Sequence, residues 1–112
     1  MELNEMAKEI HALAVSKGWW EVEHSLPEIL MLCVSELSEA LEIHRDGGKP
    51  TDYATHKLES DEKPYGIAVE LGDCIMRILD YCGHVGIDIQ AVIAAKHEYN
   101  KSRPYKHGGK EC

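Results

Sequence analysis

The 112-residue sequence has no long apolar run. Its longest uninterrupted apolar stretch covers residues 29–34, whereas a membrane-spanning helix needs about 20 such residues. The segment from Met1 to Glu5 also lacks the basic start and the apolar stretch of a signal peptide. We therefore expect a cytoplasmic protein with no membrane as partner, in which the four cysteines are reduced thiols.

A positive net charge is missing as well. The chain has 12 Lys and Arg against 20 Asp and Glu, a formal net charge of −8, whereas long nucleic acids are bound by basic surfaces. The cations are concentrated near the C-terminus, because residues 1–95 contain 7 basic and 18 acidic residues and residues 96–112 contain 5 and 2. The length predicts one domain over residues 1–112 with a basic tail over 103–112, and the charge excludes long nucleic acid as a partner.

The alternation of apolar and polar residues that is typical of strands is also absent. Apolar residues instead recur at spacings of three and four, which indicates helices. Ser25 suits a helix cap, and Gly18, Gly83 and Pro104 suit helix ends. The chain is predicted to be all-α, with helices over residues 3–17, 25–45, 64 or 65 to 82, and 89–102.

The connection between the second and third predicted helices, residues 46–63, is long for a compact helical domain. Connections of this length serve as binding loops or lids, or contain a short helix of their own. Residues 53–59 could form one or two helical turns.

Two acidic pairs occur in matching sequence frames 34 residues apart. The second helix contains Glu36 and Glu39, and the third contains Glu70 and Asp73, each pair interleaved with apolar and small residues. A helix turns by about 100° per residue, so both pairs lie beside an apolar stripe and not opposite to it. Gly72, in the middle of the third helix, indicates close approach of another group, because a helical glycine costs about 1 kcal/mol relative to alanine.

If the two apolar stripes pack together, the four carboxylates converge along one seam. Clustered carboxylates raise one another's pKa unless cations neutralise them. Mg²⁺ prefers oxygen ligands and leaves coordination positions for substrate phosphates. The pattern therefore favours a Mg²⁺ site over two solvated acidic helix faces, with Mn²⁺ as a possible substitute.

The segments Glu36-x-x-Glu39 and Glu70-Leu71-Gly72-Asp73 resemble the metal-binding signature of the MazG-like all-α nucleoside triphosphate pyrophosphohydrolases. The similarity extends over residues 25–110. It implies a four-helix bundle-like fold, a homodimer or homotetramer, and hydrolysis of a nucleoside triphosphate (NTP or dNTP) to the monophosphate and pyrophosphate, as in nucleotide-pool housecleaning. Many members carry a further acid before each pair, where this chain has Ser35 and Val69, so the number of metal ions stays open.

The same resemblance assigns roles to individual residues. Glu36, Glu39, Glu70 and Asp73 would be the metal ligands. Glu39 is our candidate for the catalytic base, because a carboxylate near an acidified water can accept its proton.

The C-terminal residues resemble the family's nucleotide-contacting segment. Lys96, Asn100 and Arg103 would hold the phosphates, and their spacings of four and three place them on one helix face. His107 and Lys110 in the tail are further candidates for phosphate contact. Trp20 is our candidate for stacking on the base, whose identity the sequence leaves open.

Two other functional classes stay open at this point. A carboxylate-bridged di-iron bundle needs Glu-x-x-His on two helices, and Glu21-x-x-His24 is the single instance in this chain. A non-catalytic helical interaction module could use the acidic seam to bind a cation or a partner protein.

Overall fold

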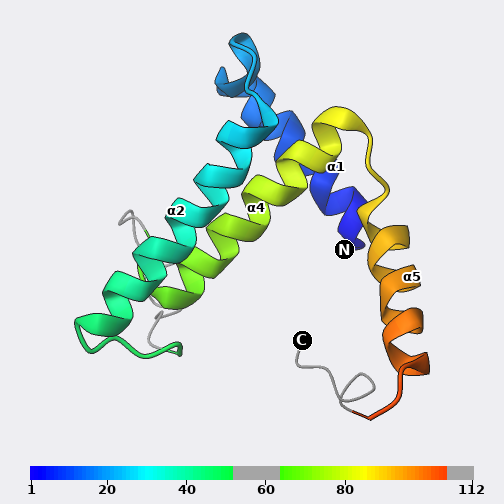
Figure 1. Ribbon diagram of the computed structural model, residues 1–112. Coiled ribbons are helices and arrows are strands. Elements are labelled where there is room, and N and C mark those ends of the chain that lie inside the picture. The colour runs from blue at the N-terminus through cyan, green and yellow to red at the C-terminus, as the bar shows by residue number, and fades with distance from the viewer. Residues whose placement is uncertain (52–63, 106–112) are drawn as a thin grey trace.

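The computed structural model describes residues 1–51 and 64–105 (Figure 1). These residues form four α-helices and one short 3-10 helix, and no strand occurs among them. The elements in chain order are α1 (Leu3–Ser16), η1 (Trp19–Glu21), α2 (Leu26–Arg45), α4 (Ile67–Val85) and α5 (Ile89–Ser102). The predicted all-α class is confirmed. The proposed short helix at residues 53–59 lies outside the described residues.

The predicted starts of α2 and α5 are confirmed by their capping contacts. Ser25 Oγ accepts a hydrogen bond from the backbone N–H of Glu28 at 3.2 Å. Asp88 Oδ1 accepts one from the backbone N–H of Ala91 at 3.0 Å. Each cap satisfies a backbone donor that has no partner within the first helical turn.

The predicted end of α4 at Gly83 is wrong. The helix continues to Val85 and ends at Gly86, whose φ of +82° lies in the left-handed region that favours glycine. Gly83 instead allows α1 to cross α4 closely, since a Cβ at this position would lie 2.9 Å from the carbonyl oxygen of Ala7 and 2.7 Å from the Cβ of His11.

Helices α2 and α4 lie side by side and antiparallel, and α1 packs on the C-terminal half of α4 (Figure 1). The core between these helices is small, and its most buried side chain is Leu79. Three predicted core thiols, Cys33, Cys74 and Cys82, are buried as expected. The buried apolar residues are Ala7, Ile29, Cys33, Ala40, Ile67, Cys74, Leu79 and Cys82.

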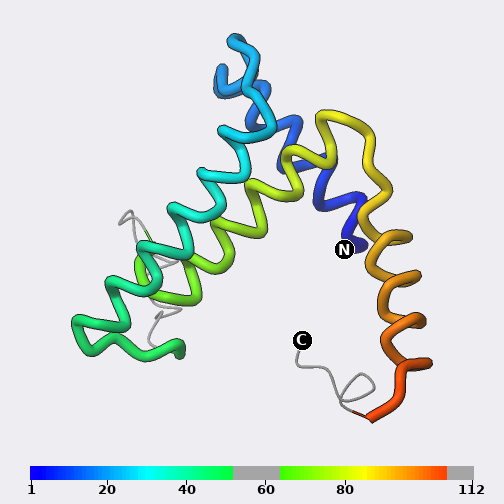
Figure 2. The backbone as a smooth tube through the Cα atoms, viewed as in Figure 1, coloured from blue at the N-terminus to red at the C-terminus, as the bar shows by residue number. Residues whose placement is uncertain are grey.

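Helix α5 extends away from α2 and α4 (Figure 2) and contains no buried residue. It is attached to the start of α1 through Asn4, whose Nδ2 donates to Asp88 Oδ1 at 2.8 Å and whose Oδ1 accepts from the backbone N–H of Gln90 at 3.2 Å. The radius of gyration is 16.8 Å, compared with about 13 Å for a compact chain of this length. One chain by itself therefore does not form the compact four-helix bundle that was expected.

Within residues 1–51 and 64–105, no single helix is long and apolar enough to span a membrane. Helices α4 and α5 satisfy the length and composition criteria as a pair, which is bent by 115° at the break between them.

Candidate metal centre

Glu36 and Glu70 lie within the buried stripe of α2 and α4, and not beside it as predicted. Helix α2 buries Ile29, Cys33, Glu36 and Ala40 at spacings of four, three and four. The leucines expected in that stripe, among them Leu37, are about half exposed. The physical reason is side-chain size, because the small residues of the stripe let the two helices approach closely around the carboxylates.

Three of the four predicted metal ligands converge. One carboxylate oxygen from each of Glu36, Glu70 and Asp73 lies within 4.8 Å of the others. Glu36 and Glu70 are buried, with exposures of 8% and 9%, and Asp73 is half-buried. Glu39, on the exposed side of α2, lies outside this set of three but interacts with the carboxyl group of Glu70. We call Glu36, Glu39, Glu70 and Asp73 the acidic cluster.

The pKa of Glu70 is strongly perturbed. Its pKa is raised from 4.5 to about 8, first by burial and then by the neighbouring carboxyl groups of Glu39 and Glu36. Its Oε2 atom is buried and accepts no hydrogen bond from the described part of the chain. A buried acceptor without a donor is costly, and a cation placed among these oxygens would satisfy it. The donor set, made entirely of carboxylate oxygens, fits a hard divalent ion such as Mg²⁺.

Arg77 is part of the site and was missed in the sequence analysis. Its Nε donates to Glu36 Oε1 at 3.0 Å, and its guanidinium carbon lies 5.7 Å from the centre of a Trp19 ring. The sequence spacing could have indicated its position, since Arg77 follows Glu70 by seven residues, or two helical turns. It therefore lies on the same face of α4 as the acids.

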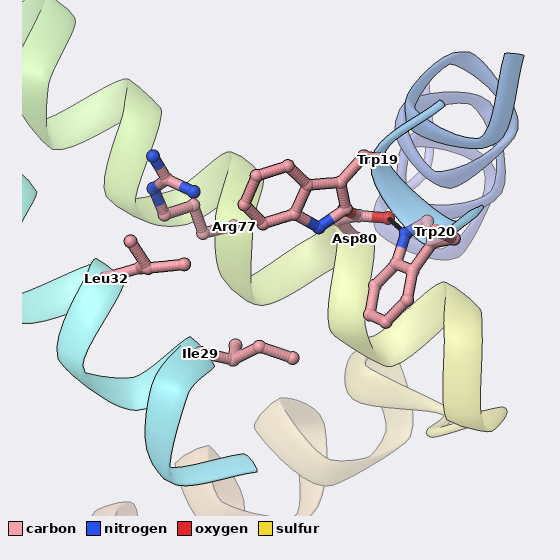
Figure 3. A pocket seen from close by; sticks show the side chains of 6 residues that line it. All are labelled: Trp19, Trp20, Ile29, Leu32, Arg77 and Asp80. Carbon is pink, nitrogen blue, oxygen red and sulfur yellow. Dashed lines mark hydrogen bonds between the residues drawn. The ribbon is translucent and has the colours of Figure 1, made fainter. Parts of the chain in front are cut away.

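The two tryptophans line a small pocket between η1, α2 and α4 (Figure 3). Trp19 faces the side of the pocket that carries Arg77, and Trp20 lies beside Asp80. The lining residues are Trp19, Trp20, Ile29, Leu32, Arg77 and Asp80.

Trp20, the candidate for base stacking, is held in a polar aromatic cluster. Its Nε1 donates to Asp80 Oδ1 at 3.0 Å, and its ring stacks on His84 with centroids 3.8 Å apart. His11 Nδ1 contacts the same Asp80 oxygen at 2.8 Å. One face of the Trp20 ring is thus occupied within the chain, and Asp80 is a buried acid that the sequence analysis did not single out.

The di-iron interpretation does not fit the contacts of His24. Its Nδ1 lies 2.7 Å from Glu28 Oε2, and its Nε2 lies 2.7 Å from the carbonyl oxygen of Trp19. Both ring nitrogens are therefore engaged in contacts within the chain, and neither is directed at a metal site. These contacts raise the pKa of His24, the carbonyl of Trp19 having the largest effect and Glu28 the next.

The predicted phosphate-binding residues of α5 are not brought to the acidic cluster within one chain. Lys96 Nζ and the guanidinium carbon of Arg103 lie 4.8 and 5.6 Å from the ring centre of Tyr99 on the same helix. Asn100 lies on the exposed surface of that helix. His107 and Lys110 lie outside the described residues.

The interpretation of Gly72 as a point of close approach is not supported within the described part of one chain. Among residues 1–51 and 64–105, a Cβ placed on Gly72 would have no atom of another element within 4 Å. The close approach occurs at Gly83 instead, because α1 crosses α4 nearer its C-terminal end.

Comparisons with protein-family models, curated proteins and solved structures gave no match to this chain. The similarity to the pyrophosphohydrolases is thus limited to short sequence motifs.

Proposed function

We propose that this protein is a Mg²⁺-dependent nucleoside triphosphate pyrophosphohydrolase, with Mn²⁺ as a possible substitute ion. The observation that carries the proposal is the state of Glu70. It is a buried carboxyl group with an unsatisfied oxygen and a pKa raised to about 8, located among other carboxylates at the position where the motif resemblance expects a metal ligand.

Glu36, Glu70 and Asp73 would hold the ion, with Glu39 as a further ligand or as the base. Bound Mg²⁺ would neutralise phosphate charge. It would also acidify the water that hydrolyses the bond between the α and β phosphates. Glu39 suits the role of proton acceptor because its side chain is exposed and yet adjacent to Glu70. Lys96, Asn100 and Arg103 would hold the phosphates, as the motif resemblance implies.

A second copy of the chain would cover the exposed apolar side chains of α2 and α4. All but one of these residues follow a member of the buried stripe by one position, and the remaining one, Ile78, follows the half-buried Arg77. In antiparallel helices this one-residue advance turns both sets toward the same side of the pair. A two-helix apolar face of this kind would form a four-helix bundle with its copy. We therefore propose a homodimer or homotetramer. The exposed residues are Leu30, Val34, Leu37, Leu41, Leu71, Ile75 and Ile78.

The decisive experiment measures pyrophosphate release from a panel of NTPs and dNTPs with Mg²⁺. We expect turnover of at least one nucleotide by the wild type and a loss of at least about 100-fold in Asp73→Asn, since the amide is a much weaker ligand for the ion. Asp46→Asn is the matched control, because Asp46 is exposed and follows the last residue of α2.

Absence of turnover by the wild type, or full activity of Asp73→Asn, would refute the enzyme proposal. Binding of Mg²⁺ without turnover of any nucleotide would instead support a non-catalytic cation-binding module.

A further inference from the structure

The guanidinium group of Arg77 is bound to the protein through its Nε atom, whereas its two terminal nitrogens are available to a ligand. Its Nε donates to Glu36 Oε1 at 3.0 Å, and its guanidinium carbon lies 5.7 Å from the centre of a Trp19 ring. These two contacts restrain the orientation of the group. The two terminal nitrogens form no hydrogen bond with residues 1–51 or 64–105, and the side chain is 31% exposed.

Such an arrangement has free donors in a fixed geometry. Arginine carries five N–H groups, of which Nε uses one here, and it keeps its positive charge at every physiological pH. The terminal N–H groups form a planar fork that matches two oxygens of a phosphate group. Binding an anion there would cost little side-chain entropy, because the contacts with Glu36 and Trp19 already orient the group.

The position of Arg77 relative to the acidic cluster indicates which anion would bind. Glu36 is shared, since one of its oxygens contacts Arg77 while the residue also belongs to the set of carboxylates within 4.8 Å of one another. Among the described residues, Arg77 is the cation that forms an ion pair with this set, while Lys96 and Arg103 lie on α5. An anion bound to both a metal in the cluster and the fork of Arg77 must have several negatively charged oxygens, as a phosphate chain has.

We propose that Arg77 is a substrate-binding residue that holds the phosphate chain beside the metal centre through its terminal nitrogens, while its Nε stays paired with Glu36. This assignment rests on the proposed pyrophosphohydrolase function. It adds a phosphate contact that does not depend on α5 or on the C-terminal tail.

The test is calorimetric titration of inorganic pyrophosphate into the full-length protein at saturating Mg²⁺, which requires no knowledge of the base. Arg77→Gln should weaken pyrophosphate binding at least about tenfold, the loss expected for a charged hydrogen bond. Arg77→Lys should bind with intermediate affinity, since lysine keeps the charge but loses the fork. Arg45→Gln is the matched control and should bind like the wild type, because Arg45 forms an exposed pair with Glu42.

A second titration, with Mn²⁺ and no pyrophosphate, separates binding of the anion from positioning of Glu36. Under the proposal, neither Arg77 variant weakens Mn²⁺ binding, because neither substitution removes a metal ligand and neither adds positive charge beside the ion. Weakened Mn²⁺ binding in both variants, or pyrophosphate affinities equal to that of Arg45→Gln, would overturn the proposal. If circular dichroism shows that Arg77→Gln is unfolded, Arg77→Lys decides alone by the same criteria.

Failure of this inference can be told apart from failure of the proposed function. Pyrophosphate binding that depends on Arg77, in a wild type that hydrolyses no nucleotide, would support the anion site and refute the enzyme. Nucleotide hydrolysis with the same KM in the wild type and in Arg77→Gln would support the enzyme and refute the role of Arg77. A wild type that does not bind pyrophosphate would also refute that role.

Discussion

Replacing Glu70 with glutamine tests the electrostatics of the acidic cluster without any assumption about catalysis. The Glu70 pKa is raised to about 8 in the folded chain, against 4.5 as the ordinary value. At pH values between these two pKa values, Glu70 holds a proton in the folded state that it has lost in the unfolded state. The free energy of unfolding therefore decreases as pH rises across this window, by up to about 1.4 kcal/mol per pH unit.

The resulting destabilisation is large for a domain of this size. At pH 7 it is on the order of 3 kcal/mol relative to pH values below 4.5, out of a typical total of about 5 to 15 kcal/mol. Between pH 6 and pH 8 the wild type should lose on the order of 2 kcal/mol from this group. Glutamine resembles the protonated acid in shape and charge, so Glu70→Gln should lack this contribution.

The assay is urea unfolding followed by circular dichroism at pH 6, 7 and 8, in EDTA and at one protein concentration. Glu42→Gln is the control, because the side chain of Glu42 is 62% exposed. Adding Mg²⁺ should stabilise the wild type, more strongly at pH 8 than at pH 6 because the proton competes with the ion, and should have little effect on Glu70→Gln. Equal pH dependence of unfolding in the wild type and in Glu70→Gln would refute the reasoning.

Further predictions concern packing, assembly and the Trp-His contacts. Gly83→Ala should lower the free energy of unfolding by about 1 to 3 kcal/mol, because the added Cβ meets the backbone of α1. Gly72→Ala should instead raise the free energy of unfolding by up to about 1 kcal/mol. Urea unfolding that shows a change of the same sign for both variants would contradict this prediction. Leu37→Lys should convert an oligomer into a 12.6 kDa particle in size exclusion with light scattering, and a wild type that is already a 12.6 kDa particle would contradict the assembly. The contacts of His24 raise its pKa above 6.5, so their stabilisation is present below pH 6.5 and is lost as pH rises through the folded pKa. In thermal unfolding, His24→Gln should have a smaller deficit in Tm relative to the wild type at pH 8 than at pH 5.5, and a constant deficit would show that His24 does not titrate between these values.

Local features of this protein could be predicted from the sequence. The caps Ser25 and Asp88 act within one helical turn, so short-range spacing is sufficient to place the starts of α2 and α5. The matching frames of the acidic pairs also predicted that four carboxylates come together, because two helices in register need only pack side by side. Three of them, Glu36, Glu70 and Asp73, do so.

The acidic residues show where sequence reasoning stopped. Apolar spacing placed Leu37 in the core, yet Glu36 occupies that stripe and Leu37 is about half exposed. The choice between two adjacent stripes depends on how closely the helices approach, which small side chains such as Cys33 and Ala40 determine. Spacing along one helix contains no information on that distance.

By itself, the sequence determined the helical class, the helix caps and the presence of two acidic pairs in register, because each depends on residues within a few positions of one another. Only the tertiary structure decided the side of α2 that is buried, the contact of Arg77 with Glu36, the crossing of α1 at Gly83 and the direction of α5. Each of these depends on contacts between residues distant in the chain, and their distances and burial exist only once the helices have packed.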